Sequence, residues 1–63
     1  MRLELKIGCD NAAFEENPRA EVARILREVA DKLDDNPSYA DFYETLRDIN
    51  GNDVGRVKLH PRG

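Results

Sequence analysis

Apolar and charged residues alternate along the first nine positions of the chain, MRLELKIGC. Apolar side chains occupy positions 3, 5, 7 and 9, and charged side chains occupy positions 2, 4 and 6. A period of two is typical of a strand with one buried face. We therefore predict a strand over residues 2–9. On this pattern Cys9 lies on the buried side, as a small apolar residue.

A second pattern, with a period between three and four, follows in NPRAEVARILREVADKL. The apolar residues that share one side of it are Val22, Ile25, Leu26, Val29 and Leu33. This spacing predicts an amphipathic helix over residues 18–33. Asn17 suits the N-cap, where its side-chain oxygen accepts from a free backbone N–H, and Pro18 suits the first helical position.

The segment between the strand and the helix, DNAAFEE, contains one large apolar residue, Phe14. We expect Phe14 to fold back under the start of the helix. Asp10 or Asn11 suits the cap of a short turn in this segment, because both side chains readily bond to backbone groups nearby.

Two β-prone runs, residues 42–49 and 52–59, flank the dipeptide Asn50-Gly51. Asn-Gly in this setting predicts a hairpin over residues 42–59 with a two-residue type I′ turn, in which both turn residues have positive φ. The turn fixes the register. On one face the predicted pairs are Phe42 with Leu59, Glu44 with Val57, and Leu46 with Gly55. On the other face they are Tyr43 with Lys58, Thr45 with Arg56, and Arg47 with Val54.

The first of these faces is the more apolar, so we expect it to lie against the helix. It carries Phe42, Leu46, Val57 and Leu59. Glu44 is the polar exception on this face. Its side chain must either reach the edge of the sheet or be moved by a bulge.

Together these elements predict an α+β fold with the order β-α-β-β, as one domain over residues 1–63. The second strand runs in the same direction as the first, and the third runs opposite to both. A central third strand therefore gives a three-stranded antiparallel sheet, order 1-3-2, with one helix packed on one face. The alternative, order 1-2-3, places the first two strands side by side through a right-handed crossover.

The chain has 63 residues, of which 40% are hydrophobic and 37% charged, and its formal net charge is −3. A folded domain of this size has a narrow stability margin. A single cysteine forms no internal disulfide, so we expect self-association, as a homodimer, to add stability. No apolar run is long enough to span a membrane, and we expect a cytoplasmic protein without a membrane partner.

The sheet face opposite the helix is predicted to be basic, with five bases and the single acid Glu4. Ile49 lies on this face beside the turn. The predicted binding face consists of Arg2, Lys6, Tyr43, Arg47, Ile49, Val54, Arg56 and Lys58. Cations and an aromatic ring on one sheet face suit single-stranded nucleic acid. Long Lys and Arg side chains equally protect an uncovered sheet from pairing with other chains.

Candidate catalytic or metal-binding groups are few. Ser38 is the one serine and His60 the one histidine, and no spacing brings a third group to them. Asp48, Asn50 and Asn52 alternate as in a calcium loop, but the loop's glycine at the sixth position and glutamate at the twelfth are absent here. We therefore predict no catalytic residues, no metal and no cofactor.

Three segments resemble a group of small phage and prophage proteins. They are DNAAFEENP (residues 10–18), EVARILREVADKL (residues 21–33) and DINGNDVG (residues 48–55). The shared pattern is a strand, DNAAFE, a helix with ARILR, and D-x-NGN-x-VG, and residues 34–45 match least. The group has no assigned activity. The resemblance therefore implies a phage or prophage accessory protein in the host cytoplasm and implies no catalytic residues.

We expect this protein not to be an enzyme and to act by protein–protein binding, with itself as a homodimer or with a host or phage protein. The binding surface would be the open sheet face or a sheet edge, since pairing two edges makes a continuous six-stranded sheet. The alternative function is binding of single-stranded nucleic acid through the basic face, which would weaken steeply with added salt.

Overall fold

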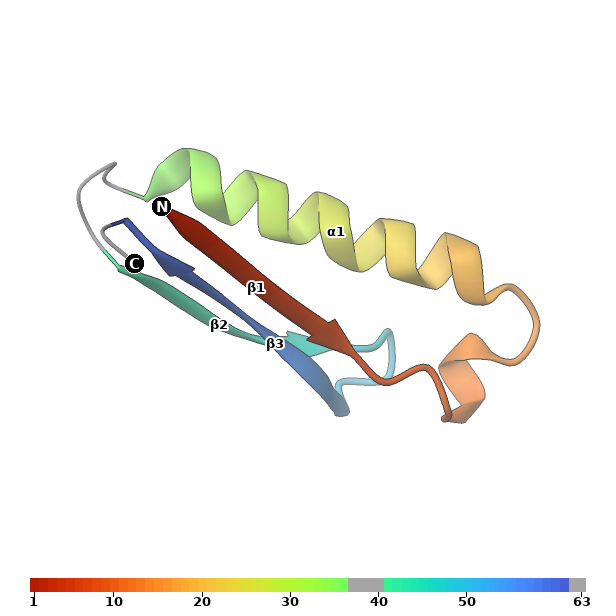
Figure 1. Ribbon diagram of the computed structural model, residues 1–63. Helices are drawn as coiled ribbons and strands as arrows, with labels where there is room; N and C mark the ends of the chain where they lie inside the picture. The colour runs from red at the N-terminus through yellow and green to blue at the C-terminus, as the bar shows by residue number, and fades with distance from the viewer. Residues whose placement is uncertain (37–40, 62–63) are drawn as a thin grey trace.

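The computed structural model describes residues 1–36 and 41–61. Three strands form one antiparallel sheet in the order β1-β3-β2: β1 (Arg2–Ile7), β2 (Phe42–Arg47) and β3 (Asp53–His60). The helix α1 (Pro18–Asp35) lies across one face of this sheet, and a short 3-10 helix, η1 (Ala12–Phe14), precedes it (Figure 1). The predicted α+β fold, β-α-β-β with the order 1-3-2, is confirmed, and the alternative order is wrong.

Helix α1 begins at the predicted residue and ends two residues later than predicted, at Asp35. Asn17 is its N-cap: the side-chain oxygen of Asn17 accepts a hydrogen bond from the backbone N–H of Ala20 at 3.2 Å. Such a cap contributes about 1 kcal/mol to stability. At the other end, the N–H of Asn36 donates to the carbonyl of Leu33. Within the described residues no helix is long and apolar enough to cross a membrane.

Strand β1 is shorter than predicted, because it ends at Ile7. It pairs with β3 from Arg2 opposite His60 to Ile7 opposite Gly55, and the N–H of Gly8 adds a last hydrogen bond to the carbonyl of Val54 at 2.7 Å. The chain then leaves the sheet. Cys9 is exposed, so the prediction of a buried Cys9 is wrong: the alternation of a strand ceases to decide burial where the strand ends.

The register of the hairpin is confirmed from Phe42 opposite Leu59 to Leu46 opposite Gly55. The turn itself differs from the prediction. The N–H of Gly51 donates to the carbonyl of Asp48, and the N–H of Asp48 donates to the carbonyl of Asn52. The loop therefore has three residues, 49–51. Gly51 has φ +86°, and no other described residue has a positive φ. This is a type I turn closed by a left-handed glycine, not a type I′ turn.

A bulge on β3 compensates for the longer loop. The register shifts after Leu46, so that Arg47 lies opposite Asp53 and not opposite Val54 as predicted. Val54 is the extra residue on β3. The third loop residue moves the pairing by one position, and the bulge moves it back. The two deviations cancel, which is why the pairs beyond them match those of a two-residue turn.

The core lies between α1 and the sheet. Its buried members are Phe14, Ile25, Val29, Phe42, Leu46 and Val57. Val57 is fully buried, at the middle of the central strand. Phe14 folds under α1 as predicted, and Asn11 caps the turn that carries it by accepting a hydrogen bond from the N–H of Ala13.

The helix covers β2 and β3 more fully than β1. Leu26, predicted to lie on the buried side of the helix, is 43% exposed, and Leu3 on β1 is 53% exposed. A helix is about 10 Å wide, and strands lie about 4.8 Å apart. One helix therefore covers about two strands, and the third keeps part of its apolar side in contact with solvent.

Candidate functional site

The open face of the sheet carries most of the predicted binding face. In the ladder, Lys6 lies opposite Arg56, and Lys58 lies between Glu4 on one side and Tyr43 on the other. Glu4, Lys6, Arg56 and Lys58 line a hollow on this surface. The residues that the fold brings together here are Arg2, Lys6, Tyr43, Arg56 and Lys58.

The charges on the open face are partly paired with one another. The carboxylate of Glu4 forms an ion pair with the guanidinium of Arg2 at 3.3 Å and lies 3.8 Å from the imidazole of His60. The ammonium group of Lys58 lies 5.6 Å from the centroid of the Tyr43 ring, within cation–π range. Lys6 and Arg56 make no ion pair with any described residue. They are the cations most available to a ligand.

The other predicted members of the binding face lie close to the hairpin loop. Val54 is partly buried and packs against the core, because the bulge turns it toward the helix side; its predicted place on the open face is wrong. The guanidinium of Arg47 donates to the carbonyl of Gly51 at 3.4 Å and so lies along the turn. Ile49 is exposed at the tip of the hairpin.

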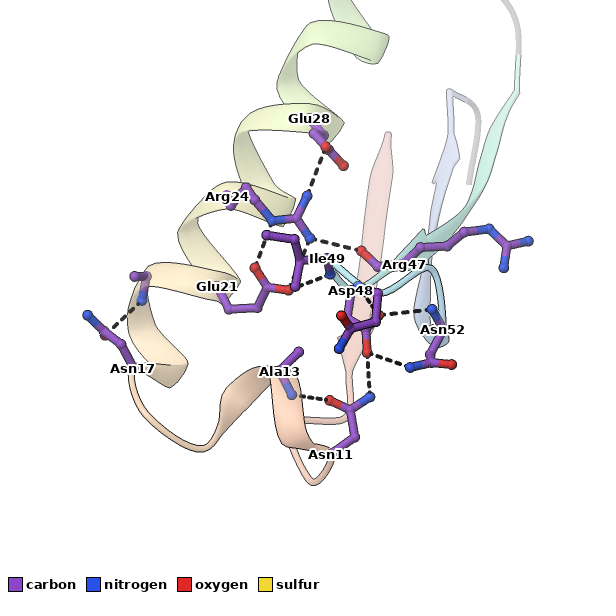
Figure 2. Close-up of polar contacts among 12 residues, drawn as sticks. Asn11, Ala13, Asn17, Glu21, Arg24, Glu28, Arg47, Asp48, Ile49 and Asn52 are labelled. Carbon is purple, nitrogen blue, oxygen red and sulfur yellow. Dashed lines mark hydrogen bonds and ion pairs between the residues drawn. The ribbon is translucent and has the colours of Figure 1, made fainter.

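Asp48 forms the centre of a buried polar cluster at the base of the hairpin loop (Figure 2). One carboxylate oxygen of Asp48 accepts from the N–H groups of Asn50 and Asn52, each at 2.9 Å. The other accepts from the side-chain amides of Asn11 at 2.7 Å and Asn52 at 3.1 Å. Burial alone would raise the pKa of Asp48, but these four hydrogen bonds outweigh it and lower the pKa below its ordinary value.

Glu21 links the first turns of α1 to the same loop, as Figure 2 shows. One oxygen of this buried carboxylate accepts from the backbone N–H of Ile49 at 2.8 Å. The guanidinium of Arg24 donates to both oxygens, at 2.7 and 3.1 Å. The hydrogen bond from Arg24 is the main reason that the pKa of Glu21 is lowered, against the opposing effect of burial. Arg24 also donates to the carbonyl of Arg47 and to Glu28.

This cluster holds the fold together and does not present a ligand site. Both oxygens of Asp48 and both of Glu21 are occupied by N–H donors, which is the reverse of what a cation requires. Within residues 1–36 and 41–61, no buried side-chain nitrogen or oxygen lacks a hydrogen-bond partner. In the same residues no three His, Cys, Asp or Glu side chains are grouped to hold a metal. Ser38, considered above as a nucleophile, lies outside the described residues.

The edge of the sheet at β1 presents a second surface, which is apolar. On α1, Pro18, Val22, Ala23 and Leu26 contribute to one exposed apolar area. Because Glu21 and Lys32 mark the side of the helix that faces β2 and the hairpin, helical periodicity puts Val22 and Leu26 on the opposite side, toward β1. We define the β1 flank as Leu3, Leu5 and Ile7 of β1 together with Val22 and Leu26 of α1.

At the opposite edge an ion pair bridges α1 and β2 beside a hollow between these two elements. The ammonium of Lys32 on α1 donates to the carboxylate of Glu44 on β2 at 2.7 Å. Glu44, the polar exception of the predicted register, therefore reaches the helix at the sheet edge, as one of the two predicted solutions required. The two edges of the sheet thus differ: β2 is fastened to the helix by an ion pair, and β1 is not.

The pattern of apolar residues did not predict the exposure of the β1 flank, because Leu3 and Leu26 both match the buried side of their elements. The width of the elements could have predicted it, because a single helix is too narrow to cover three strands.

No protein-family model, no curated protein and no solved structure matches the chain.

Proposed function

We propose that this chain is a non-enzymatic protein-binding domain that docks its partner on the β1 flank. The observation that carries this proposal is that β1 is an edge strand whose helix-side residue Leu3 is 53% exposed. Edge strands offer unpaired N–H and C=O groups to an incoming chain. An apolar strip beside such an edge adds the side-chain contacts by which strand addition becomes selective.

The proposal includes a phage or prophage accessory role in the host cytoplasm. This part rests on the resemblance of residues 10–18, 21–33 and 48–55 described above. The proposal that the protein is not an enzyme is supported by the structural contacts that its ionisable groups make. The two buried carboxylates, Glu21 and Asp48, join the helix, the loop and the hairpin. Among the described residues, the one acid paired with His60 is the exposed Glu4.

Site-specific photo-crosslinking tests the docking surface. A photoreactive phenylalanine analogue replaces Leu3 in one variant and Tyr43 in a matched control, which is 55% exposed on the opposite sheet face and the opposite edge strand. Both variants are irradiated in the cells that express them. We expect a discrete protein adduct from position 3 and none from position 43. Adducts from position 43 with none from position 3 would overturn the proposal.

A second candidate function is binding of single-stranded nucleic acid on the open face. It is favoured by Lys6 and Arg56, which lie opposite each other and pair with no described acid, and by the exposed ring of Tyr43 on which a base could stack. The ion pair between Arg2 and Glu4 weakens it, because it removes one cation and places an acid among the others.

An NMR titration with a short random single-stranded DNA tests this second candidate. If it holds, shifts appear at Lys6, Tyr43, Arg56 and Lys58 and fade as salt is raised from about 50 to 200 mM, because phosphate contacts release counterions. If the domain is a protein-binding module only, the spectrum stays unchanged even at the lower salt concentration.

A further inference from the structure

We propose that the partner on the β1 flank is a second copy of this chain, bound by antiparallel pairing of the two β1 strands about Leu5. This inference rests on the proposed function, because it names the occupant of the same surface. The product is a two-fold symmetric dimer with one continuous six-stranded sheet and both helices on the same side. Three observations carry it: the direction of the edge hydrogen-bonding groups, the charge pattern of β1, and the uncovered apolar strip.

The first observation is the direction of the backbone groups along β1. The N–H of Gly8 donates to Val54 on β3, in line with the pairs of Arg2, Glu4 and Lys6 along the same ladder. In an antiparallel strand, alternate residues direct their N–H and C=O groups to opposite sides. The groups of Leu3, Leu5 and Ile7 therefore point away from β3, to the free edge.

The second observation is that the sequence RLELKI is complementary to itself in one register. Pairing about Leu5 puts Leu3 opposite Ile7 of the partner subunit, and Glu4 opposite Lys6 of the partner subunit. By symmetry each of these pairs occurs twice. All three edge-directed residues find a partner, and each cross-strand ion pair joins opposite charges.

The neighbouring registers lack this complementarity. Pairing about Glu4 would put two Glu4 side chains opposite each other and would also face Arg2 with Lys6. Pairing about Lys6 would put the two Lys6 side chains together. Like charges directly opposite each other destabilise a sheet. Pairing about Leu3 joins Arg2 to Glu4 but leaves Ile7 beyond the end of the other strand.

The charged groups are free to make these contacts. Lys6 is exposed and makes no ion pair with a described residue. Among the described residues, Glu4 pairs with the exposed side chains of Arg2 and His60 alone. The Arg2–Glu4 pair is 63% and 51% exposed at its two side chains, so it is worth little and easily exchanged. Lys6 of the partner subunit can therefore replace Arg2 beside Glu4.

The third observation is the apolar strip on the helix side of β1. Pairing about Leu5 brings Leu3 beside Ile7 of the partner subunit and directs Val22 and Leu26 of the two helices toward each other. This covers the large apolar side chains that the single helix leaves exposed. The β2 edge offers no such strip, because the Lys32–Glu44 ion pair occupies its helix side.

Sedimentation equilibrium of the full chain with charge variants tests the inference. The variants are Glu4→Lys and Lys6→Glu, and circular dichroism confirms that each is folded. In the proposed register each single variant faces like charges twice, so we expect its dimer dissociation constant to rise by at least about tenfold. Mixing the two variants pairs opposite charges again, and we expect a heterodimer with an affinity within about threefold of the original.

The matched control is Arg27→Glu. It makes the same change of net charge as Lys6→Glu, at an exposed position of α1 and away from β1, and we expect it to leave the dimer intact. Failure of the mixed variants to recover, or equal loss in Arg27→Glu, would overturn the proposed register. A wild-type chain that stays monomeric up to about 1 mM would overturn the dimer altogether.

These failures are distinguishable from failure of the proposed function. A monomeric chain that still forms an adduct from position 3 with a different protein refutes the second copy as occupant and leaves the docking surface in place. The absence of any adduct from position 3 refutes the surface itself.

Discussion

The carboxylate of Glu21, near the start of α1, accepts a hydrogen bond from the backbone N–H of Ile49 at the tip of the hairpin, at 2.8 Å. The two residues are 28 positions apart in the chain. This contact joins the helix to the hairpin. Arg24 orients the Glu21 carboxylate through a bidentate ion pair.

Replacement of Glu21 by Ala is expected to lower the melting temperature by roughly 5–15 °C, because it leaves the backbone N–H of Ile49 without its acceptor and removes the buried acceptor of Arg24. Glu21→Gln retains an acceptor for Ile49 and loses only the ion pair, so its loss should be smaller. Thermal unfolding followed by circular dichroism measures both. Glu28 pairs with the same Arg24 but is exposed, and Glu28→Ala is the control, expected to shift the melting temperature by less than about 3 °C. Equal shifts in all three variants would contradict the link.

The free energy of unfolding is expected to fall at acid pH because of the two buried carboxylates, Glu21 and Asp48. The pKa values of Glu21 and Asp48 are lowered in the folded protein from ordinary values of 4.5 and 3.8. A lowered pKa means that the unfolded chain binds protons more readily than the folded one. The stabilisation is therefore fully present above the ordinary pKa values and is lost as pH falls through the folded ones.

Urea unfolding from pH 7 to pH 2 measures this effect. We expect a nearly constant midpoint down to about pH 5 and a progressive fall below it. The Glu21→Gln variant has one fewer group to protonate, so its midpoint should fall less steeply. A variant curve parallel to that of the wild type would show that Glu21 does not contribute.

Neighbouring residues on β2 are expected to respond oppositely to the same substitution. Leu46 is buried against α1, and Leu46→Asp should cost more than about 4 kcal/mol and unfold the domain, since it buries an unpaired charge. Thr45 lies on the open face opposite Arg56, and Thr45→Asp should change stability by less than about 1 kcal/mol. Chemical denaturation of both variants tests the assignment of the two faces, and equal damage would refute it.

Two glycines at one end of the β1–β3 ladder are expected to differ in their tolerance of a methyl group. A Cβ at Gly55 would overlap the backbone carbonyl of Lys6, whereas a Cβ at Gly8 would meet nothing nearer than the carbonyl of Val54 at 3.7 Å. Gly55→Ala should therefore loosen the pairing of β1 and cost about 2–4 kcal/mol. Gly8→Ala should stay within about 1 kcal/mol of the wild type. Amide hydrogen exchange of β1 reports the difference, and exchange that is equally slow in both variants would contradict it.

The sequence was most informative where a single period governs a whole element. The spacing of Ile25 and Val29 located the helix, Asn17 located its start, and the Asn-Gly dipeptide located the hairpin. The pairs from Phe42 to Leu46 followed correctly even though the turn was assigned the wrong type, because the loop and the bulge at Val54 cancel in the register.

The remainder depended on contacts that no local pattern contains. Asp48 reads as a polar turn residue, and the sequence pattern does not show that Asn11, 37 positions away, supplies one of its four hydrogen bonds. Leu3 has the period of a core residue, and its exposure follows from the width of the helix above the sheet. Val54 matched the open face only under the assumption of an unbroken ladder. In each case the element was predicted correctly, and the difference between prediction and structure comes from contacts with other elements.

The compensated tip of the hairpin has a consequence for how this chain can vary in length. The loss of Val54 alone would remove the bulge and keep the register, because Gly55 would then follow Asp53 directly, with Leu46 opposite Gly55 and Arg47 opposite Asp53 as before. The loss of one residue of the loop would leave a two-residue turn between Asp48 and Asn52, with the same pairs beyond it. Neither change would exchange the inner and outer side chains of β2. Related chains that retain the fold can therefore differ in length by one residue on either side of Gly51.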